Sequence, residues 1–197
     1  MNPSAASAAV RERILDTADQ LFYAQGIQSV GVDAVVAAAA ISKRTLYRHF
    51  ASREQLVAAY LERRAAKRSE AREGDPLAEI LGVFDRLARW FASGRFRGCP
   101  FSNAIAELGG EPEHPALAVA RGVKQRHTAW FDAQLRALQV ADAPRVALQL
   151  CILVEGALAS AMQRRGDAAD VARAARTAAQ ALLHAAGVAG CAPDLRA

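Results

Sequence analysis

Apolar residues recur every three or four positions along most of the chain, the spacing of one buried helix face. Between these stripes stand short clusters of Gly, Pro, Ser and Asp, which are typical of helix ends and turns. The pattern predicts helices over residues 10–22, 33–39, 43–49, 53–73, 76–93, 102–108, 115–140, 143–165 and 168–186.

Local signals define several of these helix ends. Gly26 follows the first apolar stripe and can take the left-handed conformation of a helix end. Ser42 and Ser52 are placed to cap the third and fourth helices, and Asp33 can face the positive N-terminal end of the second. We therefore expect an all-α chain of about nine helices, with Leu46, Phe50 and a stripe over residues 56–61 in the core.

The last two predicted helices differ from the others. The helix over residues 143–165 is apolar on more than one face, and the helix over 168–186 consists mostly of Ala. Small residues let helices approach closely, and a helix apolar on two faces has to bury both. One face suits its own domain and the other suits a partner subunit.

Composition narrows the fold class and the compartment. Ala makes up 47 of 197 residues and 52% of the chain is apolar, which excludes wholesale disorder and an all-β fold. No apolar run approaches the 18 residues of a membrane span, and residues 1–10 lack the pattern of a signal peptide. Three widely spaced cysteines form no CxxC pair. We expect a cytoplasmic protein with free thiols, no cofactor and no membrane contact.

The excess positive charge lies in the first third of the chain. Residues 1–72 carry 11 Lys and Arg against 7 Asp and Glu, whereas the remainder is nearly balanced at 14 against 13. Between Ala34 and Arg53 there are four basic residues and one His, but no acidic residue. This stretch is predicted to form a helix, a short turn and a second helix, with the apolar Ile41 at the centre of the turn packing between the two helices. Its cations and hydroxyls suit duplex DNA, although a solvated basic helix would share the same charge pattern.

A resemblance to a known protein family favours DNA binding over a solvated basic helix. Leu21-Phe22 with Gly26, the run from Ala37 to Ser42, Thr45-Leu46-Tyr47-Arg48-His49-Phe50, and Ser52 to Leu56 together resemble the DNA-binding domain of TetR-family regulators. The similarity covers residues 11–61 without a gap. Two positions depart from the family pattern: Ala40 replaces a usual turn Gly, and Gly31 replaces a usual Thr or Ser cap. Ala is costlier than Gly if this backbone is left-handed.

The resemblance implies a domain plan and a set of DNA contacts. Residues 1–51 would form the DNA-binding domain, with the motif at about 31–50 and a connecting helix over 53–73; residues 75–197 would bind ligand and dimerise. Arg44 and Thr45 are assigned to base edges. The remaining predicted DNA contacts, mainly to the backbone, are Ser42, Lys43, Tyr47, Arg48, His49 and Arg53, with half of the Tyr47 ring packed in the core.

For the second domain, the resemblance implies a homodimer through the last two helices and a small apolar or aromatic effector. The dimer would bind a palindromic operator, most often as a repressor. An aromatic stripe is also typical of plain core, and both interpretations stay open. The predicted pocket residues are Phe84, Trp90, Phe91, Phe101, Asn103, His127, Trp130, Phe131 and Glu155, with Gln125 and Met162 nearby.

The sequence signals for a reactive thiol, a metal site or catalysis are weaker. Cys99, near Arg95 and Arg97, is either a sensor thiol or a small buried residue. Glu111, Glu113 and His114 lie close together and could bind a metal, but they are expected in a loop with no second His nearby. No metal ligand or catalytic residue is therefore assigned. Without GxSxG, HExxH or paired carboxylates, an enzyme is not expected. The alternatives are a transcriptional activator and a helical small-molecule-binding module without DNA recognition.

Overall fold

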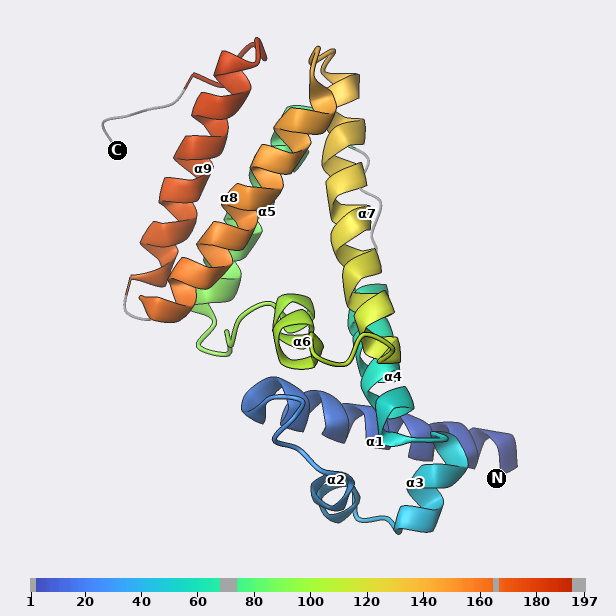
Figure 1. The fold of residues 1–197 in the computed structure, drawn as a ribbon. Coiled ribbons are helices and arrows are strands. Elements are labelled where there is room, and N and C mark those ends of the chain that lie inside the picture. Colours follow the sequence, from blue (N-terminus) through green and yellow to red (C-terminus); the bar gives the residue numbers. More distant parts are fainter. Residues whose placement is uncertain (1–2, 68–73, 165–166, 193–197) are drawn as a thin grey trace. The chain divides into compact units, whose positions relative to one another are not determined.

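The computed structural model describes residues 3–67, 74–164 and 167–192, and in these ranges it contains nine α-helices and no strand (Figure 1). The expected all-α fold is confirmed. The helices are α1 (Pro3–Gln25), α2 (Val32–Ala38), α3 (Lys43–His49), α4 (Arg53–Ala66), α5 (Pro76–Ala92), α6 (Pro100–Leu108), α7 (Pro115–Ala137), α8 (Ala143–Gln163) and α9 (Ala168–Ala185).

Most helix ends follow the predicted local signals. Gly26 stops α1 at a φ of +93°, and the Ser42 and Ser52 side chains accept backbone N–H bonds at the starts of α3 and α4. The α7 helix ends three residues earlier than predicted because Gln139 is left-handed, with a φ of +59°. The α6 helix begins two residues early, with Pro100 in its first turn. Two predicted extensions, residues 68–73 after α4 and Arg165 after α8, lie outside the described residues.

The chain divides into two compact units, and the first division, after residue 70, lies close to the boundary expected near Gly74. The first unit comprises residues 1–70 with 99–123, and the second comprises 71–98 with 124–197. Residues 99–123, which include α6, therefore pack with the N-terminal helices. The Gln28 backbone N–H donates to Glu107 Oε2 at 2.9 Å, and the Gln28 side-chain amide donates to the Glu107 carbonyl. These partners are 79 residues apart in the chain, so no local pattern indicates the contact.

In the first unit, α1 and α4 are joined by apolar packing and by paired charges. The Phe22 and Tyr60 rings lie 5.5 Å apart, and both side chains are buried. The Arg64 guanidinium donates to both oxygens of Asp19, at 2.5 and 3.0 Å, and lies 4.1 Å above the Tyr23 ring. A bidentate pair backed by an aromatic ring fixes the two helices in rotation as well as in distance.

In the second unit, α5, α8 and α9 pack together, with α8 and α9 side by side (Figure 1). The α8 helix has the two apolar faces that its sequence predicts. Val146, Leu150 and other apolar residues on one face are buried, while Leu148 and Ile152 remain 55% and 61% exposed. By length and composition alone, α8 would be apolar enough to cross a membrane, contrary to the sequence expectation. Its buried face is the packed face of a bundle helix.

Candidate nucleic-acid interface

The turn between α2 and α3 sets the angle of the basic helix. Ala40 is left-handed with a φ of +50°, the conformation for which Ala is less suited than Gly. The Ala40 N–H donates to the Ala37 carbonyl at 3.2 Å, and the Ile41 N–H donates to the Val36 carbonyl at 3.1 Å. These two bonds close the C-terminal end of α2, and the Ile41 side chain that follows is partly buried. Gly31 is the N-cap of α2 and provides no side-chain hydrogen bond.

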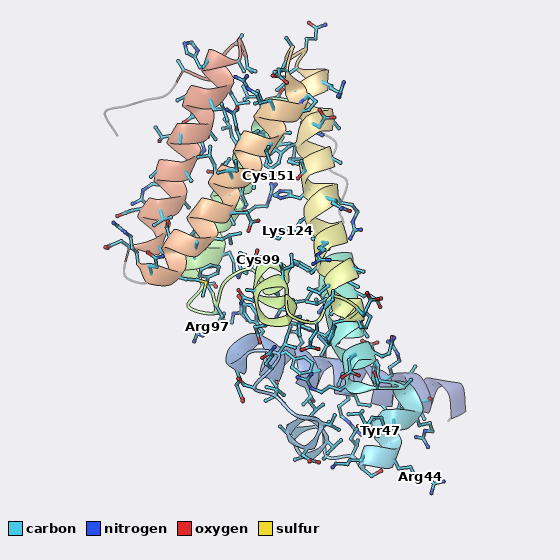
Figure 2. The ribbon with its side chains drawn as sticks, in the orientation of Figure 1. Arg44, Tyr47, Arg97, Cys99, Lys124 and Cys151 are labelled. Atoms are coloured by element: carbon cyan, nitrogen blue, oxygen red, sulfur yellow. The ribbon has the colours of Figure 1, made fainter. Side chains whose placement is uncertain are left out.

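The α3 helix has one buried edge and one exposed edge. Leu46 is fully buried and Phe50, its C-terminal cap, is 4% exposed, as predicted. Ser42 Oγ accepts the Thr45 N–H at 3.1 Å and lies 2.9 Å from Thr45 Oγ1. Because Leu46 packs into the core, Arg44 and Arg48 lie exposed on α3, and the Tyr47 side chain is 47% exposed. Figure 2 shows Arg44 extending away from α3.

Lys43 forms an ion pair that the sequence did not indicate. Its Nζ lies 2.7 Å from Asp33 Oδ1, on the first turn of α2, and both side chains are more than half exposed. The hydrogen bond and the charge of Asp33 raise the pKa of Lys43 above its ordinary value. Lys43 is thus fully charged at neutral pH, but an acidic side chain already neutralises it. A DNA phosphate would have to compete with Asp33 for this ammonium group.

Replacing Asp33 with Asn is expected to strengthen DNA binding without regard to sequence, because Lys43 becomes available to phosphates. An exposed ion pair is weak because solvent and salt screen it, so the gain in affinity should stay within about fivefold per protomer. Anisotropy titrations on an unrelated duplex at several salt concentrations would measure it. Asp33→Glu, which keeps the charge, is the matched control. Equal affinities for the Asn and Glu variants would contradict the competition.

Arg53, predicted as a DNA contact, is engaged inside the protein. Its Nε donates to the Val30 carbonyl at 3.3 Å, and its Nη2 donates to the carbonyls of Val30 and Ile27. The side chain is partly buried, and these bonds tie the start of α4 to the loop that precedes α2. Arg53 therefore positions the helix-turn-helix, and its guanidinium is already occupied by backbone acceptors.

His49 lies at the C-terminal end of α3 with a partly buried ring. Its Nε2 atom is buried and has no hydrogen-bond partner among the described residues. Burial lowers the pKa of His49 below its ordinary value near 6.5, and the nearby charges of Arg48 and Arg11 lower it further. The folded protein thus favours neutral His49, which remains close to two cations.

This depressed pKa predicts a pH-dependent stability. The unfolded chain binds the His49 proton first as pH falls below about 6.5, so stability should decrease from there through the lower folded pKa. Thermal melts at pH 7.5 and 5.5 would show it as a larger loss of Tm for wild type than for His49→Gln. The exposed His184→Gln is the control and should keep the wild-type dependence. Identical losses in all three proteins would refute the assignment.

The predicted pocket residues are distributed over both units. Phe101 and Asn103 belong to the first unit, and the other seven belong to the second. Phe84, Phe91, Phe101 and Phe131 are buried, whereas Trp90, Asn103, His127, Trp130 and Glu155 are partly buried. Met162 is 46% exposed on α8.

Within the second unit, ring contacts occur in two aromatic groups. Phe96, which the sequence analysis missed, lies 4.9 Å from the Trp90 ring and 4.6 Å from the Phe91 ring. On α7, His127 and Trp130 lie 4.8 and 5.1 Å from Phe131. Spacing alone predicts apolar faces but does not separate pocket lining from core.

Polar contacts between α7 and α8 accompany the second aromatic group. Glu155 Oε1 accepts a hydrogen bond from Lys124 Nζ at 2.5 Å, which supplies the partner that Glu155 was expected to need. One turn along, the Thr128 hydroxyl lies 3.3 Å from Cys151 Sγ (Figure 2 labels Lys124 and Cys151). A groove of about 400 Å³ also runs along these helices. Among the residues suggested from sequence only Gln125 lines it, with Thr128, Ala129, Asp132, Pro144 and Ala147.

The weaker chemical candidates have structural explanations. Cys99 is 2% exposed at the N-cap of α6, which favours the buried-thiol interpretation. His114 is also buried, and its Nδ1 accepts the Ala116 N–H at 3.2 Å at the start of α7. Over the residues that the structure describes, no group of three or more His, Cys, Asp or Glu could hold a metal ion.

The part of the chain that contains α3 is similar to known proteins. Residues 14–60 match the family described as "Bacterial regulatory proteins, tetR family". An uncharacterized HTH-type transcriptional regulator of Mycobacterium tuberculosis is 46% identical over 52 residues. The match spans about a quarter of the length of that curated relative (26%) and the same share of this chain.

Two solved structures are similar over nearly the whole chain. One, from Streptomyces avermitilis, is assigned as a TetR transcriptional regulator; it is 31% identical, with a TM-score of 0.77, and the alignment covers 91% of this chain and 98% of that one. The other is a TetR-family transcriptional regulator from Streptomyces coelicolor, at 28% identity and a TM-score of 0.81, covering 91% and 96%. The similarity therefore extends well beyond the residues around α3.

Proposed function

Since the chain belongs to the TetR family and is a DNA-binding transcriptional regulator, not an enzyme, we propose that it acts as a cytoplasmic homodimeric repressor. In this proposal it binds a palindromic operator through residues 1–51 and is released by a small apolar or aromatic ligand bound within residues 75–197. The observation that carries it is the exposed basic edge of α3, held outward by the buried Leu46.

Each side chain on this edge has a proposed role. Arg44 and Thr45 read base edges, because they lie in the first turn of α3 and a recognition helix contacts bases with its N-terminal residues. Ser42, Lys43, Tyr47, Arg48 and His49 contact the phosphate backbone. Arg53 acts through its hydrogen bonds to Ile27 and Val30, by holding the motif in shape.

The exposed face of α8 supports the dimer. Leu148 and Ile152 are one helical turn apart, so they form an apolar patch that a second copy would cover. A two-fold axis through α8 and α9 would present two α3 helices to successive major grooves, about 34–36 Å apart. Both half-sites would then contribute to the affinity.

The effector site is proposed around the partly buried groups of α7 and α8. His127 and Trp130 supply aromatic surface, and the Lys124–Glu155 pair supplies a polar group to orient a ligand. A ligand releases DNA only through a higher affinity for the arrangement whose α3 helices no longer match the operator.

Selection of bound fragments from sheared DNA of the source organism, at moderate salt, tests the function. Recovery of a discrete palindromic site would support the proposal, and the neighbouring genes would suggest the chemistry of the ligand. Recovery of no fragment above background by folded, dimeric protein would overturn it. The basic edge of α3 would then be a solvated helix surface that does not bind DNA.

A further inference from the structure

Arg11 of α1 lies at the C-terminal end of α3, although 37 residues separate it from Arg48. Its guanidinium carbon is 5.1 Å from the centre of the Phe50 ring, and Phe50 caps α3. The charge of Arg11 also reaches His49, whose pKa it lowers. Arg11 and Arg48 thus form a basic cluster built from two helices, beside the neutral ring of His49.

The acidic residues of α1 are largely compensated from α4. Asp16 pairs with Arg63 at 2.8 Å, and Asp19 forms the bidentate pair with Arg64. Glu12 lies 3.4 Å from Arg63, and its other oxygen is 3.7 Å from Arg11 in an exposed pair. Arg11 therefore shares its nearest acidic partner with another cation and keeps 45% of its side chain exposed.

The end of α3 at which this cluster lies favours a phosphate contact. A recognition helix in the major groove contacts base edges with its N-terminal residues, and its C-terminal end can contact the DNA backbone. When α3 occupies that groove, groups at its C-terminal end approach the sugar-phosphate chain bordering it. Lys43, at the opposite end of α3, is neutralised by Asp33, whereas α3 contains no acidic residue and Arg11 shares Glu12 with Arg63.

We propose that Arg11, stacked on Phe50, is a phosphate-contacting residue that extends the DNA interface from the helix-turn-helix onto α1. The aromatic ring holds the guanidinium in place before DNA arrives, so little side-chain freedom is lost on binding. Because the contact is to the DNA backbone and to no base, it adds the same affinity for every DNA sequence.

Arg11→Met tests this inference, because Met keeps an apolar stem over Phe50 and removes only the charge. Titrations of the full-length dimer on its selected operator and on an unrelated duplex, each across a salt series, would be compared with wild type. Each lost phosphate contact lowers the slope of log K against log salt by about 0.9, and affinity by about fivefold near 0.15 M salt. The loss should be equal on both duplexes.

Two further variants keep the result interpretable. Arg11→Lys retains the charge and should keep most of the wild-type slope. Arg13→Met removes the same charge from an exposed position about 200° around α1 and should leave the operator slope unchanged. If Arg11→Met and Arg13→Met give the same slope, Arg11 does not contact phosphate. Failure of the wild type to bind any duplex would instead concern the proposed function itself.

Discussion

Replacing Leu148 and Ile152 together with Glu is expected to convert the protein into monomers and to lower operator affinity by more than a thousandfold. The two side chains are 55% and 61% exposed on α8. Burying each of them fully is worth about 1.5–3 kcal/mol, and a two-fold interface buries four. Glutamates there would also bring like charges together. Sedimentation equilibrium gives the oligomeric state, and anisotropy on the operator gives the affinity.

A matched double variant controls for added charge. Ala133 and Ala137 are exposed on α7 with the same four-residue spacing, so Ala133→Glu with Ala137→Glu adds equal charge away from the α8 patch. This control should stay dimeric and bind the operator as wild type does. Circular dichroism melts check that each variant folds. A folded Leu148 and Ile152 variant that remains dimeric would show that another surface holds the subunits together.

Arg44→Ala is expected to have the second-largest effect, and a different one. If Arg44 reads a guanine, each half-site loses about 1–3 kcal/mol, or about 2–6 kcal/mol for the dimer, and preference at that base pair relaxes. Titrations on the operator and on operators substituted at each position would reveal both. Arg48→Ala should instead weaken binding to all duplexes alike. An Arg44→Ala variant that keeps both affinity and preference would remove Arg44 from the base-reading residues.

Local signals in the sequence were sufficient to predict much of the fold. Ser42 and Ser52 cap the helices predicted for them, α3 has its predicted bounds, and Gly26 ends α1 as expected. Each of these features depends on residues within four positions of one another. The buried Leu46 and Phe50 were likewise predicted, because helical spacing indicates which side faces inward.

Contacts distant in sequence could not be predicted in this way. Arg53 stands in a basic run and was assigned to DNA, yet its acceptors lie 23 and 26 residues earlier. The tie between Gln28 and Glu107 likewise places α6 in the first unit against the expected boundary. The pocket assignment stays a prediction; of its residues, Phe101 belongs to the first unit, and Phe84 and Phe131 belong to the second.

The ion pair between Lys43 and Asp33 has a consequence for how quickly such a regulator locates its operator. A chromosome offers millions of unrelated sites, and the time lost on them rises with purely electrostatic attraction. The Lys43 ammonium group must leave the Asp33 carboxylate, 2.7 Å away, before it can bind a phosphate. This weakens its attraction to unrelated DNA and shortens the time spent on each such site. At the operator, the base contacts proposed for Arg44 and Thr45 would supply the missing affinity. Fewer copies per cell would then be enough to keep the operator occupied.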